Sequence, residues 1–221
     1  MQRLVLFDLD NTLLDRQWAL AEWAADFCRT HGLDGGAEGH LVDALQERAY
    51  PATFERLRHE LVLEEPTATL WDDYVTGIAA RVPRRPEVIK GLEQLHAARW
   101  RLGILTNGAA NIQRAKIAAA GLAGLVDAIV ISEEIGARKP EADAFHVAVA
   151  RCGGTPREEG WMVGDNPEND IRGGQSAGLK TIWVSQDGPW PDHLAPPDHA
   201  VPDALSAINL LLGTVQTRTA R

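Results

Sequence analysis

Acidic residues stand close together at two places where a short apolar run has just ended. Asp8 and Asp10 follow a run that starts at Leu4, and Asp165 follows the run 161–163. Two carboxylates this close repel each other unless a cation neutralises them, and a divalent metal ion is the usual cation. A carboxylate can also attack phosphorus as a nucleophile. These acids therefore point to metal-assisted chemistry, and a polar turn that leaves a strand is the structural alternative.

Residues suited to binding an anion follow two further runs. Thr106, Asn107 and Gly108 come directly after the run 102–105 and offer a hydroxyl, an amide and a flexible backbone at the start of a predicted helix. Such a helix start is a natural cradle for an anion. Lys139 stands just before another predicted helix, where its ammonium could contact a phosphate and a carboxylate at once. A helix-capping turn and a solvated lysine are the alternatives.

The acidic segment extends beyond Asp165. Gly164 precedes it, and we expect this glycine to let the backbone turn sharply. Asp170 lies five residues after Asp165 and could orient either the water ligands of a metal ion or the lysine. A helix start rich in Asp and Asn is the alternative interpretation.

The elements that must position these residues are short apolar runs that alternate with helical patterns. The runs lie at residues 4–9, 102–105, 128–131, 161–163 and 181–184. Runs without polar alternation are typical of strands buried on both faces. We predict an α/β fold, in which a parallel sheet carries helices on both faces. The carboxyl ends of parallel strands share one edge, so the four motifs should converge there.

The segment 16–83 interrupts this alternation. It holds no convincing strand and carries four apolar stripes at helical spacing, which lie at residues 20–27, 41–45, 54–61 and 71–78. The segment is too long for an ordinary loop, and its stripes can bury one another. We predict an all-helical subdomain at residues 16–83, inserted into a core of residues 1–15 and 84–213. Residues 214–221 are polar, and we expect a frayed tail there.

Composition excludes several classes of protein. The 221 residues include 22 basic and 31 acidic side chains, a net charge of −9, which suits neither nucleic acid nor an anionic membrane. Cys28 and Cys152 lie far apart, so neither a disulfide scaffold nor a zinc site is expected. No apolar stretch approaches the roughly 18 residues of a membrane span. We expect a soluble cytoplasmic protein without nucleic-acid or membrane partners, and a monomer by default.

Taken together, the four motifs resemble those of the haloacid dehalogenase superfamily. The resemblance extends from Phe7 to about Val184. It implies a Rossmann-like, three-layer catalytic core with a helical cap inserted between the first and second motifs. The segment 121–139 is too short to hold a cap of a second type.

The resemblance also implies roles for the acidic residues. Asp8 corresponds to the nucleophile that forms an aspartyl-phosphate intermediate. Asp10 corresponds to the general acid that protonates the leaving group and then activates water. A Mg²⁺ ion is implied between the side chains of Asp8 and Asp165 and the backbone carbonyl of Asp10. Asp170 would support this metal site without binding the ion.

The remaining motif residues resemble a phosphate-binding set. The Thr106 hydroxyl and the backbone amides of Asn107 and Gly108 would hold the phosphate. Lys139 corresponds to the lysine that steadies both the phosphate and the nucleophile. The implied activity is a Mg²⁺-dependent phosphatase, a hydrolase that acts on a small phosphorylated metabolite such as phosphoglycolate, a sugar phosphate or a nucleotide monophosphate.

Some other reactions of the superfamily require residues that differ from those of this sequence. Haloacid dehalogenases lack the second acid of the first motif, whereas Asp10 and Thr12 are present here. Phosphonate cleavage uses a cap lysine, and the segment 16–83 contains no lysine. A sugar-phosphate mutase shares all four motifs and stays open. A phospho-accepting signalling protein is about half this length, and an inactive binding protein would be expected to lack one of the motif residues.

Residues of the helical insertion are expected to set substrate specificity. Three arginines could reach a second anionic group of the substrate, although solvated helix faces are the alternative: Arg48, Arg56 and Arg58. Three tryptophans could line a pocket: Trp18, Trp23 and Trp71. The helical spacing of Trp23 and Trp71 favours a place in the core of the insertion.

Overall fold

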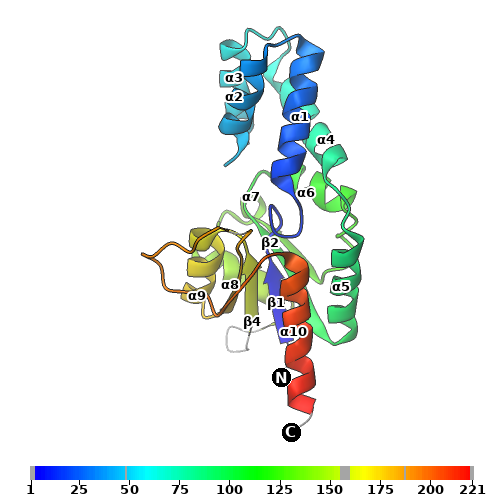
Figure 1. Ribbon diagram of the computed structural model, residues 1–221, viewed down its shortest axis with the longest axis vertical. Coiled ribbons are helices and arrows are strands. Elements are labelled where there is room, and N and C mark those ends of the chain that lie inside the picture. The colour runs from blue at the N-terminus through cyan, green and yellow to red at the C-terminus, as the bar shows by residue number, and fades with distance from the viewer. Residues whose placement is uncertain (1–2, 48, 155–159, 187, 220–221) are drawn as a thin grey trace. The chain divides into compact units, whose positions relative to one another are not determined.

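The computed structural model describes residues 3–47, 49–154, 160–186 and 188–219 (Figure 1). The chain folds into two compact units. The first unit, called the sheet unit here, comprises Met1–Leu14, Arg85–Asn107 and Gly121–Arg221. The second, called the helical unit, comprises Asp15–Arg84 and Gly108–Ala120.

The sheet unit is built on parallel strands. In the described part of the chain these are β1 (Arg3–Phe7), β2 (Trp100–Thr106), β3 (Ala128–Ile131), β4 (Gly160–Gly164), β5 (Lys180–Val184) and β6 (His199–Val201). They form one sheet in the order β3-β2-β1-β4-β5-β6, and every neighbouring pair is parallel. The predicted α/β class and the five predicted strands are confirmed. The short, largely exposed β6 has no apolar run, and the sequence did not predict it.

Helices cover both faces of this sheet, which gives the three layers of the Rossmann-like fold. On one face α8 (Ala142–Arg151) packs with Leu4 and Leu6 of β1 around the buried ring of Phe145. Val5 and Phe7 alternate with these residues and point to the other face. On that face α5 (Pro86–Ala97) and α10 (Ala204–Thr219) lie side by side (Figure 1). Shorter elements complete the unit: α7 (Ser132–Ile135), the π-helical turn η1 (Pro167–Arg172) and α9 (Gly173–Ser176).

The strand order determines where a ligand can bind. The chain leaves β1 toward β2 and β3 on one side, then returns to β4, β5 and β6 on the other side. The loops after β1 and β4 therefore diverge, and such a topological switch point is where open α/β sheets bind ligands. Asp8 and Asp165 directly follow these two strands.

The helical unit contains α1 (Arg16–His31), α2 (Gly35–Leu45), α3 (Pro51–Glu60), α4 (Thr67–Arg81) and α6 (Ala110–Ala119). The four helices expected at residues 16–83 are present. The addition of α6 differs from the predicted division, which assigned residues 108–120 to the core. An apolar stripe shows which face of a helix is buried but not its partner, and α6 packs against α4.

Aromatic side chains form the core of the helical unit. Its rings belong to Trp23, Phe27, Phe54, Trp71 and Tyr74, and neighbouring rings lie 4.8 to 6.2 Å apart. Arg16, at the start of α1, is also buried and donates to the backbone carbonyls of Leu45 and Gln46 at the end of α2. These contacts satisfy carbonyls that the end of a helix leaves without a partner.

Two of the three tryptophans considered for specificity are core residues, which agrees with the expectation from their helical spacing. Trp23 and Trp71 are buried within the helical unit. Trp18 lies in the first turn of α1 and is 48% exposed. Of these three side chains, only that of Trp18 is available at the surface of this unit for contact with a ligand.

The arginines considered for specificity have partners on their own helix. Arg56 lies 3.6 Å from Glu60, and Arg58 lies 3.5 Å from Glu55. Such pairs are typical of a solvated helix face, the alternative interpretation of these residues. Arg48 lies outside the described residues.

The C-terminal helix is longer than the sequence indicates. α10 continues to Thr219, where a frayed tail was expected from residue 214, and residues 220–221 lie outside the described part of the chain. Neither glycine nor proline occurs between Thr214 and Thr219, so nothing in this segment forces the helix to end. No helix of the described residues, α10 included, is long and apolar enough to cross a membrane.

Candidate active site

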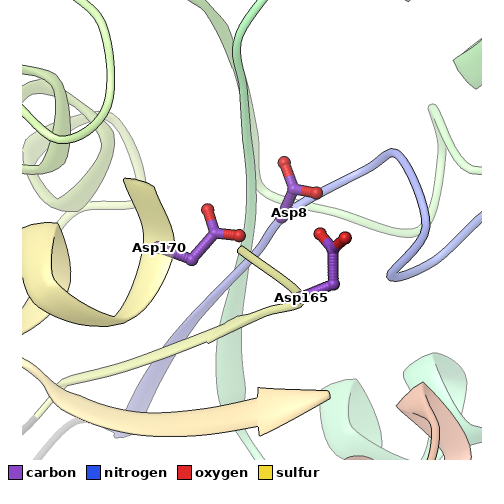
Figure 2. A group of neighbouring side chains, drawn as sticks. All are labelled: Asp8, Asp165 and Asp170. Atoms are coloured by element: carbon purple, nitrogen blue, oxygen red, sulfur yellow. The ribbon is translucent and has the colours of Figure 1, made fainter. Parts of the chain in front are cut away.

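Three carboxylates converge at the switch point. Figure 2 shows the side chains of Asp8, Asp165 and Asp170 pointing toward one another, and one oxygen of each lies within 4.8 Å of the others. Asp8 follows β1, Asp165 follows β4, and Asp170 lies in the π-helical turn η1. The structure thus joins residues from the first and fourth motifs.

Lys139 lies among these acids and is 2% exposed. Its Nζ atom is 2.5 Å from Oδ1 of Asp8 and 2.7 Å from Oδ1 of Asp170. The cluster therefore combines three carboxylates with one ammonium. A single Lys139 cannot neutralise the three acids when they are ionised.

The backbone around the cluster explains its geometry. The amide of Asp8 donates to the carbonyl of Val163 at 2.8 Å, which extends the pairing of β1 with β4 by one residue. Oδ2 of Asp170 accepts from the backbone amide of Asn166 at 3.0 Å. Asn166 in turn accepts from the amides of Glu168 and Asn169, at 3.1 and 2.8 Å, and so caps the turn that carries Asp170.

Gly164 serves a different purpose from the sharp turn that the sequence suggests. It is the last residue of β4, and its φ angle is not among the positive values of this chain. A Cβ atom at this position would lie 2.3 Å from the carboxyl group of Asp170. Glycine is needed here because the Asp170 side chain fills the space that a Cβ atom at residue 164 would occupy.

Burial and mutual repulsion disfavour the charged form of the acids. Burial raises the pKa of Asp8 to about 7, with contributions from Asp170 and Asp10, while Lys139 opposes the shift. Burial, Asp8 and Asp170 raise the pKa of Asp165 to about 8. Burial alone would lower the pKa of Lys139, but Asp170 and Asp8 outweigh it and raise this pKa. A site with excess negative charge and oxygen ligands fits a divalent cation such as Mg²⁺.

The metal-free protein is expected to lose stability as the pH rises from about 4 to about 8. In this window the folded protein holds protons on Asp8 and Asp165 that the unfolded chain, with carboxyl pKa values of 3.8, has released. The stabilisation is complete below about pH 4. It is lost as the pH rises past the pKa values that Asp8 and Asp165 have in the folded protein. Mg²⁺ affinity should rise over the same window, because the ion competes with these protons.

Thermal unfolding from pH 4 to pH 9, with and without MgCl₂, checks this expectation. Asp165→Asn is the control, because it removes one of the two titrating groups and should flatten the pH dependence of the metal-free protein. An unchanged slope in Asp165→Asn would contradict the assignment.

The other predicted residues lie in the segment after β1, at the end of β2 and directly after β2. Asp10 is half-buried in the loop after β1, where its backbone pairs with Leu14. Thr12 of the same loop places its hydroxyl 3.5 Å from Oδ1 of Asp165. Thr106 is buried as the last residue of β2. Gly108 belongs to the helical unit.

Asn107 makes a contact that the sequence analysis missed. Its side-chain Nδ2 donates to the carbonyl of Lys139 at 2.9 Å, and its Oδ1 accepts from the amide of Lys139 at 3.0 Å. The side chain therefore joins the loop after β2 to the loop that carries the lysine. No pattern in the sequence indicates this pairing.

Trp183 is a second residue that the sequence analysis missed. Its indole Nε1 donates to the backbone carbonyl of Asp165 at 2.8 Å. The ring lies in β5 and meets Trp190 edge to face at 5.0 Å. Its position near the carboxyl end of the strand beside β4 is the signal that could have identified it.

Trp183→Phe is expected to weaken Mg²⁺ binding about tenfold, because the loss of a hydrogen bond that orients a ligand residue typically costs this much. Isothermal titration with MgCl₂ measures the effect. Trp161→Phe is the control: Trp161 stacks on His199 at 5.7 Å and does not belong to the acidic cluster. Equal Mg²⁺ affinities of Trp183→Phe and the wild type would refute this role.

Comparison with known proteins defines the family. Residues 5–184 match the model of haloacid dehalogenase-like hydrolases. The chain belongs to this family. The resemblance found in the sequence is thereby confirmed, and the haloacid dehalogenase-like fold accounts for the parallel sheet and its strand order.

Relatives within the haloacid dehalogenase-like family include phosphatases. The chain is 34% identical over 218 residues to glyceraldehyde 3-phosphate phosphatase from Methanopyrus kandleri, and this match covers 92% of each protein. It is also 39% identical over 123 residues to phosphoserine phosphatase from Thermus thermophilus. That match covers 56% of this chain and about half (49%) of the relative. These similarities support a hydrolase that acts on phosphate esters.

The fold extends to other reactions in the same family. A solved 2-haloacid dehalogenase from Pseudomonas syringae matches with a TM-score of 0.70 and 26% identity, over 97% of this chain and 99% of that one. Because dehalogenases share the fold, the fold alone does not select the reaction.

Proposed function

We propose that this protein is a Mg²⁺-dependent phosphatase that hydrolyses a small phosphate monoester through an aspartyl-phosphate on Asp8. The observation that carries the proposal is the buried Asp8 carboxylate at the switch point, bonded to Lys139 and close to Asp165 and Asp170. Phosphatases among the relatives support the same reaction class.

In the first step, an oxygen of Asp8 attacks the phosphorus atom of the substrate. The bond from phosphorus to the ester oxygen breaks, and Asp10 gives its proton to the leaving alcohol. Lys139 offsets the repulsion between the Asp8 carboxylate and the phosphate anion, while Thr106 and the backbone amides of Asn107 and Gly108 hold the phosphate oxygens. Catalysis here is positioning and electrostatic stabilisation.

In the second step, Asp10, now a carboxylate, accepts a proton from water. The resulting hydroxide attacks the phosphorus atom, the bond from phosphorus to the Asp8 oxygen breaks, and inorganic phosphate leaves. Asp8 returns as a carboxylate and Asp10 as an acid, so both groups are ready for another cycle.

Asp8, Asp165 and the backbone carbonyl of Asp10 would hold Mg²⁺, and Asp170 would position Lys139 beside it. When bound, the ion neutralises phosphate charge and favours the anionic form of the carboxylates. The cluster fits this ion because its three carboxyl groups, when ionised, carry more negative charge than the one ammonium group can neutralise.

A sugar-phosphate mutase is the second candidate within the family, because it would use the same residues. A haloacid dehalogenase is less favoured, since Asp10 supplies a proton donor that attack on carbon does not require. We further propose a monomer in the cytoplasm, where the buried thiols of Cys28 and Cys152 would stay reduced. We also propose that residues 16–83, with Trp18 on their surface, act as the cap that selects the substrate.

Release of inorganic phosphate from p-nitrophenyl phosphate, with and without MgCl₂, tests the reaction. A panel of phosphorylated metabolites then identifies the substrate, and product analysis of a sugar monophosphate separates hydrolysis from a mutase reaction. Turnover that requires Mg²⁺ supports the proposal. Absence of turnover on every phosphate ester of the panel would rule out a phosphatase.

A further inference from the structure

The catalytic lysine is held at both ends. Its Nζ atom is fixed by Asp8 and Asp170, at 2.5 and 2.7 Å. Its backbone lies in the turn between α7 and α8, where the amide of Glu141 donates to the carbonyl of Arg138 at 2.7 Å. The side chain of Asn107, from the loop after β2, holds the peptide groups on both sides of the Lys139 Cα atom.

From this contact we infer that Asn107 is a positioning residue, which sets the reach of the Lys139 ammonium through the lysine backbone. The inference rests on the proposed phosphatase activity. It assigns the Asn107 side chain a purpose separate from the phosphate contact proposed for its backbone amide. The side chain uses both its donor and its acceptor on one residue, and Lys139 thereby becomes fixed to the carboxyl end of β2.

The physical reason lies in the length of the lysine side chain. Four rotatable bonds separate Nζ from the backbone. Contacts between the ammonium and the two carboxylates alone would therefore leave the rest of the side chain flexible. Fixing the backbone removes the remaining freedom. Displacement of a catalytic group by about 1 Å can cost about 100-fold in rate.

Asn107→Ala keeps the backbone amide and removes both hydrogen bonds to Lys139. We expect kcat for p-nitrophenyl phosphate to fall about 10- to 100-fold, with a smaller change in KM. Asn107→Asp, of nearly the same shape, keeps an acceptor for the Lys139 amide but loses the donor to its carbonyl, and kcat should fall as well. Circular dichroism checks that both variants fold.

A double-mutant cycle separates positioning from a direct effect. If Asn107 acts through Lys139, then Asn107→Ala costs little once Lys139→Ala is present, and kcat of the double variant stays within about twofold of Lys139→Ala. Hydrogen exchange of the Lys139 amide, which does not depend on activity, should be faster in Asn107→Ala. Asp198→Ala is the matched control, because Asp198 also makes two side-chain bonds, to the amide and hydroxyl of Thr181 at the start of β5. It should leave kcat unchanged.

The outcomes are distinct. A wild-type protein without phosphatase activity refutes the proposed function, whatever the variants do. An active wild type with an unimpaired Asn107→Ala variant, or losses that multiply in the double variant, overturns the positioning role alone. Unchanged exchange of the Lys139 amide in Asn107→Ala overturns it as well.

Discussion

Asp8→Asn is expected to lower kcat by at least about 10³-fold, because the amide cannot attack phosphorus and no aspartyl-phosphate forms. The variant should still fold. Asparagine has nearly the same shape, and it removes a carboxylate whose burial is unfavourable enough to raise its pKa to about 7. Lys139 keeps its ion pair with Asp170 at 2.7 Å. Without metal, the melting temperature should therefore equal or exceed that of the wild type.

Steady-state kinetics and acid quenching with ³²P-labelled substrate measure the loss. Label should appear on Asp8 in the wild type and be absent from Asp8→Asn. Asp198→Asn is the control, because it makes the same chemical change in an exposed acid that accepts a hydrogen bond from the amide of Thr181. Label retained by Asp8→Asn would assign the nucleophile to another residue.

Lys139→Met is expected to reduce both catalysis and stability. The variant leaves three carboxylates within 4.8 Å of one another without their internal cation. Removing one partner of a buried ion pair typically costs about 3–5 kcal/mol of folding free energy. The loss should grow with pH, because protonation of the acids relieves the repulsion at low pH. We expect kcat to fall at least about 100-fold, since in the proposed reaction the lysine offsets repulsion at the attacking oxygen.

Urea unfolding at pH 6 and pH 8, with and without MgCl₂, measures this effect. Mg²⁺ should restore part of the stability by supplying the missing positive charge. Lys180→Met is the control: this exposed lysine lies 5.5 Å from the ring centre of Trp161, and its loss should cost about 1 kcal/mol or less. Equal stabilities of Lys139→Met and the wild type at pH 8 would contradict the ion-pair network.

The strands could be predicted because burial on both faces leaves an uninterrupted apolar run. β1, with Val5, Leu6 and Phe7 fully buried, shows this most clearly. β6 could not be predicted, since His199 and Ala200 are exposed and nothing selects apolar residues there. The place of α6 was missed for another reason. The sequence predicts a helix after the run 102–105, but the partner of this helix, α4, is determined by the tertiary fold.

The charged residues of the site could be predicted from residue type and position after strands. Asp8, Asp165 and Lys139 are charged residues in positions that few structural roles require. The supporting contacts were hidden, because Asn107 and Trp183 are ordinary residues at the ends of strands. Their hydrogen bonds depend on the exact approach of two loops, which no periodicity records. The close packing of Gly164 against Asp170 was hidden in the same way.

The ion pair of Lys139 with Asp8 joins residues 131 positions apart. Asp165 comes later still in the chain, after β4. During synthesis Asp8 emerges first, and Lys139 and Asp165 follow only when most of the protein has been made. The site cannot be assembled early, because long-range contacts of parallel strands form late in folding. Recovery of activity on refolding should therefore follow the completion of the sheet. A nascent chain that ends before β4 should be inactive.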